Sequence, residues 1–280
     1  MTTPSRFWAA HSTRDFAQWR RDGTIARTIA VLPVAATEQH GPHLSLGVDT
    51  SLADGIVNAS LVHLPATLPV LFLPTQAVGY SPEHARFPGT LTLKSETLIR
   101  LWTDIGDSVA AAGITKLVLF NAHGGQVSVM DIVARDLRAR LDMLVYSVNW
   151  FNLPLIDDEG QDLNALFSAT EHRFGIHAGD IETSMMLALQ PQQVDMGQAQ
   201  NFGSRSQERA QALPILGNGR SAKLAWQTQD LNPAGAVGNA AAASAERGQH
   251  LVQAAARSLA QLLSEIDQLP ADTLRPDIAT

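Results

Sequence analysis

Four apolar runs alternate with amphipathic segments through the first half of the chain. Each run is rich in Val, Leu, Ile and Ala and lacks regular polar alternation; the runs cover residues 28–36, 66–73, 116–120 and 143–148. An uninterrupted apolar run of this length is typical of a strand that is covered on both faces, as the strands of a parallel sheet are. We therefore expect four strands, of which the first two are buried.

The segments between and after these runs have the spacing of amphipathic helices. The apolar spacing, together with capping residues and terminal glycines, predicts helices over residues 12–21, 50–61, 95–112, 126–141, 176–189 and 240–268. Strands that alternate with helices predict an α/β fold with a mostly parallel central sheet and helices on both faces. Residues 191–238 are expected to form loops with one strand at 224–227. No repeat or linker divides the chain, so residues 1–280 are expected to form a single domain.

Composition narrows the classes of function. The 280 residues are 45% hydrophobic and 17% charged, which suffices for a sizeable core. A net charge of −7 and a pI near 5.7, without a stripe dense in Lys or Arg, argue against nucleic acid and favour a small-molecule partner. Because the chain has no cysteine, a metal would be held by imidazole and carboxylate groups. The opening residues lack a signal-peptide pattern and no apolar run reaches membrane length, so we expect a cytoplasmic protein that does not bind membranes.

A short segment directly after the first apolar run concentrates acidic and imidazole side chains. Residues 37–49 read Thr-Glu-Gln-His-Gly-Pro-His-Leu-Ser-Leu-Gly-Val-Asp. Glu38 and His40 are two positions apart, so both side chains point the same way if the chain leaves the strand extended. Asp49 begins the next helix, where a carboxylate is favoured even if it is only a cap. Together the three residues predict a divalent metal site at the end of a strand.

Two later segments bring candidate ligands to the same edge of the sheet. His123 follows the third strand, in Asn-Ala-His-Gly-Gly, although such a histidine can also serve only to cap a turn. Glu182 follows His177 by about one turn, in a segment otherwise rich in Met, Leu and Ala. A carboxylate that faces inward there needs a partner such as a metal, whereas one that faces outward is merely solvated. Ligands of parallel sheets bind beyond the carboxyl ends of the strands, where these residues are expected.

The loop over residues 75–90 is a candidate substrate lid. It is long and polar and contains two prolines and two glycines, and loops of this length in compact domains are commonly functional. Tyr80, Glu83, His84 and Arg86 are its candidate substrate contacts; Arg86 would suit a carboxylate or a phosphate, unless it is only solvated. Gly124 would let the backbone come close to a ligand.

The motifs at residues 37–44, 47–49, 87–90, 121–125 and 177–184 resemble, in this order, those of the creatininase (creatinine amidohydrolase) family. The resemblance implies a Rossmann-like three-layer α/β/α fold and a homo-oligomer, often a hexamer. It also implies a centre of two divalent metal ions, zinc or manganese with iron as a further option, and hydrolysis of a carbon–nitrogen bond in a cyclic amide, amidine or formamide. Some members are assigned to peptide maturation, so a metallopeptidase acting on a peptide tail is the alternative, and a non-catalytic metal-binding protein is a third.

Position by position, the resemblance implies that Glu38, His40, Asp49 and His123 are metal ligands. Asp49 would bridge the two ions. Glu182 matches a later acidic position through its His-Ala-Gly context and is expected to be a further ligand. His177 corresponds to a histidine that lies beside the substrate and moves a proton.

The chain departs from creatininase itself at one place. There Tyr and Glu follow the motif histidine and the Glu is a ligand, whereas this chain has Gly124 and Gly125. Creatinine is therefore not the expected substrate, and Glu182 is the expected replacement ligand. The expected mechanism is attack by a metal-activated water, with His177 as general acid because its ordinary pKa is close to neutral. His43 would orient a ligand from outside the centre.

Overall fold

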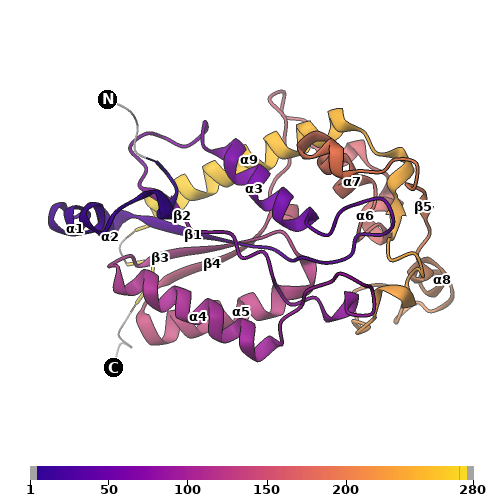
Figure 1. Ribbon diagram of the computed structural model, residues 1–280, viewed down its shortest axis with the longest axis horizontal. Coiled ribbons are helices and arrows are strands. Elements are labelled where there is room, and N and C mark those ends of the chain that lie inside the picture. The colour runs from indigo at the N-terminus through magenta and orange to yellow at the C-terminus, as the bar shows by residue number, and fades with distance from the viewer. Residues whose placement is uncertain (1–4, 271, 276–280) are drawn as a thin grey trace.

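Four parallel strands form the central sheet, in the order β2-β1-β3-β4 (Figure 1). The strands are β1 (Ile29–Val34), β2 (Val70–Phe72), β3 (Lys116–Asn121) and β4 (Leu144–Asn149). This computed structural model describes residues 5–270 and 272–275, so the first four residues, on which the expected absence of a signal peptide partly rests, lie outside it. Within the described ranges, no helix combines the length and apolarity that a bilayer crossing requires.

Helices cover both faces of the sheet, which confirms the three-layer α/β/α prediction. On one face lie α3 (Val48–Ser60), α7 (Asp180–Leu189) and α9 (Ala245–Gln268), and on the other lie α4 (Ser95–Ala111) and α5 (Val127–Leu141) (Figure 1). Every residue of β1 is buried: Val31 packs in the first core and Leu32 in the second. Burial on both faces is the reason that the apolar run shows no alternation.

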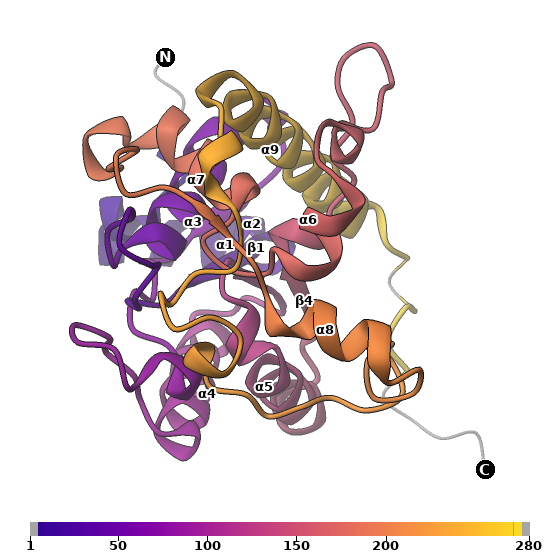
Figure 2. The same cartoon turned by 90° about the vertical axis from the view of Figure 1, so that its right-hand side faces the viewer.

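Shorter elements flank this frame. Helices α1 (Thr13–Asp22) and α2 (Thr24–Arg27) precede β1, and α6 (Ala169–Phe174) and α8 (Arg205–Ala212) lie at the end of the molecule that Figure 2 faces. The start of α1 is the predicted one, since Ser12 and Asp15 form a capping box. Two very short strands, β5 (Asn201–Phe202) and β6 (Gly238–Asn239), pair antiparallel.

Several predicted boundaries are wrong. Residues 224–227 form no strand; residues 224 and 225 are exposed, and Gln227 instead caps a short 3-10 turn, Thr228–Asp230. The second strand has only three residues, because residues 65–69 form a turn closed by a bond from the Leu68 amide to the Pro65 carbonyl. Helix α7 begins four residues later than predicted, after Gly179, and α9 begins at Ala245, where the Ser244 side chain caps it.

Candidate metal centre

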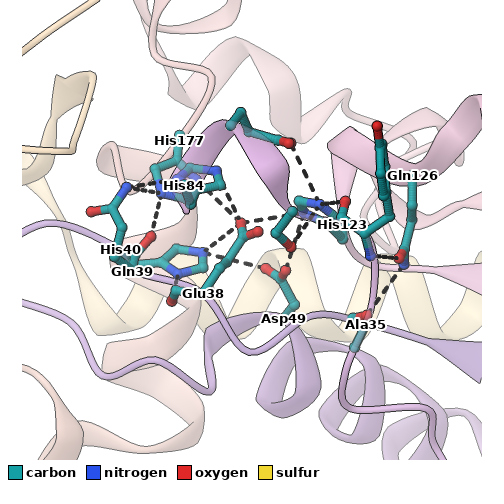
Figure 3. Close-up of polar contacts among 12 residues, drawn as sticks. Ala35, Glu38, Gln39, His40, Asp49, His84, His123, Gln126 and His177 are labelled. Atoms are coloured by element: carbon teal, nitrogen blue, oxygen red, sulfur yellow. Dashed lines mark hydrogen bonds and ion pairs between the residues drawn. The ribbon is translucent and has the colours of Figure 1, made fainter. Parts of the chain in front are cut away.

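Five candidate ligands meet beyond the carboxyl ends of β1 and β3. Figure 3 shows four of them, Glu38, His40, Asp49 and His123. Glu38 and His40 follow β1, and His123 follows β3. Asp49 lies in the first turn of α3 and Glu182 in the first turn of α7. The N-cap of α3 is Gly47, so Asp49 is not the capping residue. The Asp49 carboxylate is therefore free to face the centre.

Asp49 lies between two groups of possible ligands. Its Oδ1 atom is 3.3 Å from His40 Nε2, which is 4.0 Å from Glu182 Oε2. Its Oδ2 atom is 3.4 Å from His123 Nδ1, which is 3.2 Å from Glu38 Oε1. In each group the ligand atoms lie within 4.8 Å of one another, close enough to hold one ion. Asp49 belongs to both groups, and its two oxygens face different sets of candidate ligands.

The histidine tautomers fit a cation at both positions. His40 Nδ1 is 3.0 Å from the Glu38 carbonyl and His123 Nε2 is 3.0 Å from the Tyr80 carbonyl. A carbonyl only accepts, so these nitrogens carry the protons, and the other nitrogen of each ring turns a lone pair toward the carboxylates. A backbone carbonyl behind a histidine is the usual outer support of a metal ligand.

Several buried side-chain atoms at the centre have no hydrogen-bond partner, which also favours a bound cation. Within the described part of the chain, Glu38 Oε2, Asp49 Oδ2 and His40 Nε2 are buried and make no hydrogen bond. Leaving such atoms unpaired is costly, and a divalent ion would satisfy all three. The donor set, imidazole and carboxylate without thiolate, suits zinc, manganese or iron.

The charges around the imidazoles favour positive charge at this site. Burial alone lowers the pKa of His40, but Asp49, Glu182 and Glu38 outweigh it and raise that pKa to about 9. Burial also lowers the pKa of His123, but Glu38 and Asp49 outweigh this effect and raise that pKa well above its ordinary value. The carboxylates thus attract positive charge to both rings, and a metal ion supplies it without protons.

His177 lies beside this centre but not within α7. Its ring stacks between those of His40 and His84, with centroids 4.2 Å from each. His177 Nε2 donates to the Gln39 carbonyl at 2.7 Å, so Nδ1 turns its lone pair toward Glu38 Oε1, 3.7 Å away. Glu38, His40 and His177 are also close enough to share an ion, but that set does not include Asp49.

The surroundings of His177 favour the neutral form of its ring. Burial, and then the charges of His40 and His84, lower the pKa of His177 well below its ordinary value. The ring must therefore take up a proton before it can act as the expected general acid.

Residues of the predicted lid loop line one side of the site. Buried His84 places Nε2 3.4 Å from Glu38 Oε1, and Glu83 Oε1 lies 3.6 Å from His123 Nε2. Tyr80 contributes its carbonyl to His123, while its side chain packs against the core below α4 and α5. The side chain of Arg86 is exposed.

The two glycines after His123 differ in their surroundings. A Cβ on Gly124 would meet nothing within 4 Å. A Cβ on Gly125 would overlap the Glu83 carboxylate and the His123 ring. Gly124 thus faces open space, whereas Gly125 leaves room for Glu83.

Some residues of the site were not predicted. Buried Gln39 donates from Nε2 to His84 Nδ1 at 2.7 Å and to the Gly235 carbonyl at 2.8 Å. Thr228 Oγ1 lies 2.8 Å from the same His84 nitrogen. The position of Gln39 between Glu38 and His40 was an available signal, but nothing in the sequence marks Thr228. His43, expected to orient a ligand, instead bonds Thr183 Oγ1 at 3.0 Å.

Sequence comparison agrees with this geometry. Residues 15–263 match the family model Creatininase, described as creatinine amidohydrolase. The mycofactocin precursor peptide peptidase of Mycobacterium ulcerans is 32% identical over 79% of this chain and 78% of its own length. The 3-dehydro-scyllo-inosose hydrolase of Thermotoga maritima is 26% identical over 89% of this chain and 81% of its own. The creatinine amidohydrolase of Pseudomonas putida is 26% identical over 85% of this chain and 89% of its own length.

Solved structures share the fold. A candidate creatinine amidohydrolase from Bacteroides fragilis matches with a TM-score of 0.72 at 25% identity, over 88% of this chain and 92% of that one. A creatininase manganese form matches with a TM-score of 0.70, at 23% identity over 94% of this chain and 99% of that one. A zinc–zinc form of a creatininase mutant matches with a TM-score of 0.72, at 23% identity over 94% and 98%. The chain belongs to the creatininase family of hydrolases.

Proposed function

We propose that this chain is a metal-dependent amidohydrolase that cleaves a carbon–nitrogen bond, other than a peptide bond, in a small amide, amidine or formamide. The observation that carries the proposal is the position of Asp49, with one carboxylate oxygen toward His40 and the other toward His123. Unpartnered buried atoms on Glu38, Asp49 and His40 support a centre of two ions. Zinc, manganese or iron would suit these ligands.

Three residues would hold each ion. Glu38, Asp49 and His123 form one group, and His40, Asp49 and Glu182 form the other. Two divalent ions supply Lewis acidity, which polarises a carbonyl and lowers the pKa of a water near it. The chain itself fixes the tautomers of both histidines through the Glu38 and Tyr80 carbonyls, so that their lone pairs are ready for the ions.

His177 and His84 would handle the protons at the reacting carbonyl. His177 Nδ1 can take the proton that an attacking water loses and return it to the leaving nitrogen. Gln39 donates to His84 Nδ1, so His84 carries its proton on Nε2, on the side of Glu38. The neighbouring rings thus offer one acceptor and one donor to the substrate.

A second candidate function is cleavage of a peptide tail. The relative from Mycobacterium ulcerans, at 32% identity, is named a peptidase. The chain that follows α8 crosses the end of the molecule (Figure 2). Several large apolar side chains of this region are exposed: Leu213, Ile215, Leu216 and Leu224. Such side chains could hold apolar residues of a peptide.

Metal analysis and a substrate panel would separate these functions. We expect about two equivalents of metal per chain, as a two-metal site requires, and turnover of cyclic amides or formamides. Turnover of peptides alone would favour the second candidate, and bound metal without turnover would favour a non-catalytic metal-binding protein. A chain that binds none of zinc, manganese and iron would overturn the proposal.

We also propose that the protein assembles as a homo-oligomer, a hexamer by family resemblance, and works in the cytoplasm. The family match over residues 15–263 supports the assembly. Light scattering after size exclusion tests it, and a monomer at micromolar concentration would contradict it. Cell fractionation tests the location.

A further inference from the structure

The Glu182 carboxylate depends on an unusual turn. Ala178 has a φ of 54°, a left-handed conformation that residues other than glycine seldom adopt. Its amide donates to Glu182 Oε2 at 2.6 Å, so the turn sets the position of the candidate ligand. The same turn carries His177, whose carbonyl accepts from the Val237 amide at 2.9 Å. Whatever holds residues 177–179 in place therefore also positions both side chains.

A buried carboxylate holds this turn from behind. Glu171, in α6, is 4% exposed, and its two oxygens accept from two backbone amides. Oε1 accepts from Asp180 at the start of α7 at 2.6 Å, and Oε2 accepts from Asn239 in β6 at 2.8 Å. One side chain thus joins the helix that bears Glu182 to the strand next to Val237.

Three glycines make room for that carboxylate. A Cβ on Gly175, Gly179 or Gly238 would overlap Glu171. Gly238 has a φ of 128°, which by itself requires glycine. Gly175 and Gly179 have φ values of −84° and −88°, so their backbones do not need positive φ. The Glu171 carboxylate accounts for the lack of a side chain at these two positions.

We propose that Glu171 is a positioning residue of the candidate metal centre. Its carboxylate fixes the turn 177–179 and thereby places Glu182 against His40. The metal part of this inference rests on the proposed function. A residue that merely capped α7 would contribute to the stability of the fold and leave metal affinity unchanged, and this difference provides the test.

Glu171→Gln is the informative change, because one of the two backbone amides would then face an NH2 group instead of an acceptor. Titration of the metal-free protein with Zn²⁺ and with Mn²⁺, against a competing chelator, should show about a 10- to 100-fold loss of affinity for one ion. The ion held by Glu38 and His123 should be retained. Gly175→Ala, which expels the carboxylate by overlap, should give the same selective loss and serves if the first variant does not fold.

The matched control is Arg247→Met. Arg247 pairs with the Asp180 carboxylate at 2.8 Å, at the same end of α7, but its guanidinium bonds neither of the backbone amides that Glu171 holds; its other partners are the Leu166 and Ala242 carbonyls. This variant should lower the melting temperature and keep both metal affinities. Unchanged affinities in Glu171→Gln, or an equal loss in the control, would overturn the proposal.

A second measurement needs no metal. Hydrogen exchange at the Ala178 amide reports the turn directly, because that amide donates to Glu182. Exchange should be faster in Glu171→Gln than in the wild type or in Arg247→Met. Unchanged exchange would refute the positioning role, whereas a wild type that binds no metal would refute only the proposed function.

Discussion

The carboxylate of Glu83 fills the space in which a side chain on Gly125 would lie. Creatininase itself resembles this chain but has a glutamate at the position of Gly125, so the two arrangements exclude each other. This difference accounts for the expectation that creatinine is not the substrate.

We predict that Gly125→Ala destabilises the protein by about 1–3 kcal/mol, the usual cost of overpacking. Glu83→Ala in the same chain should recover part of that loss, because the Cβ then meets only the His123 ring. Thermal unfolding of both single variants and the double variant measures the coupling. Strict additivity would show that Glu83 does not occupy this space in solution.

Much of the fold follows from the sequence because the two inner strands, β1 and β3, are buried on both faces, whereas the edge strand β4 is partly exposed. The run that contains Leu32 is apolar throughout, and an unbroken apolar run of this length is typical of a buried strand. Strands β5 and β6 have two residues each, too few to show any periodicity. Residues 224–227 were wrongly predicted to form a strand because they are mostly apolar. An apolar run forms a strand only where a neighbouring strand can pair with it.

The candidate ligands were predictable where they lie close in sequence. The side chains of Glu38 and His40 were expected to point the same way because they are two positions apart in an extended segment. Asp49 was expected near them because it stands at the start of the predicted helix. Residues brought in from distant loops were not predictable by spacing. Thr228 contacts His84 across 144 positions, and only the folded chain brings the two together.

We predict that Asp49→Ala loses both metal ions and all hydrolysis but remains folded. The carboxylate faces both groups of ligands, so its loss affects both ions. The helix keeps its start, because Asp49 makes no capping bond. Elemental analysis measures the metal, and circular dichroism of the metal-free variant checks the fold. Full occupancy would remove Asp49 from the centre.

We predict that His177→Ala keeps its metal and loses kcat by about 100- to 10,000-fold, as expected for a residue that moves a proton in the transition state. KM should change less. The reason is geometric: His177 Nδ1 faces Glu38 with a free lone pair, while neither of the two groups that share Asp49 includes this ring. If metal content falls together with activity, His177 is a ligand and its assigned role is wrong.

The last prediction concerns Glu182, the expected substitute for the missing glutamate at position 125. Its Oε2 atom lies 4.0 Å from His40 Nε2, on the side of the centre away from His123. Glu182→Gln retains an oxygen that can accept from the Ala178 amide but loses the charge.

The ion held by His40 and Asp49 should therefore bind more weakly in Glu182→Gln, while the ion held by Glu38 and His123 remains. Stepwise removal with a chelator measures the two affinities separately, and Glu83→Gln is the control. Glu83 is also an acidic residue near the centre, but its contact is the outer nitrogen of His123, 3.6 Å away. Equal occupancy of both positions and normal turnover in Glu182→Gln would mean that another group completes the second site.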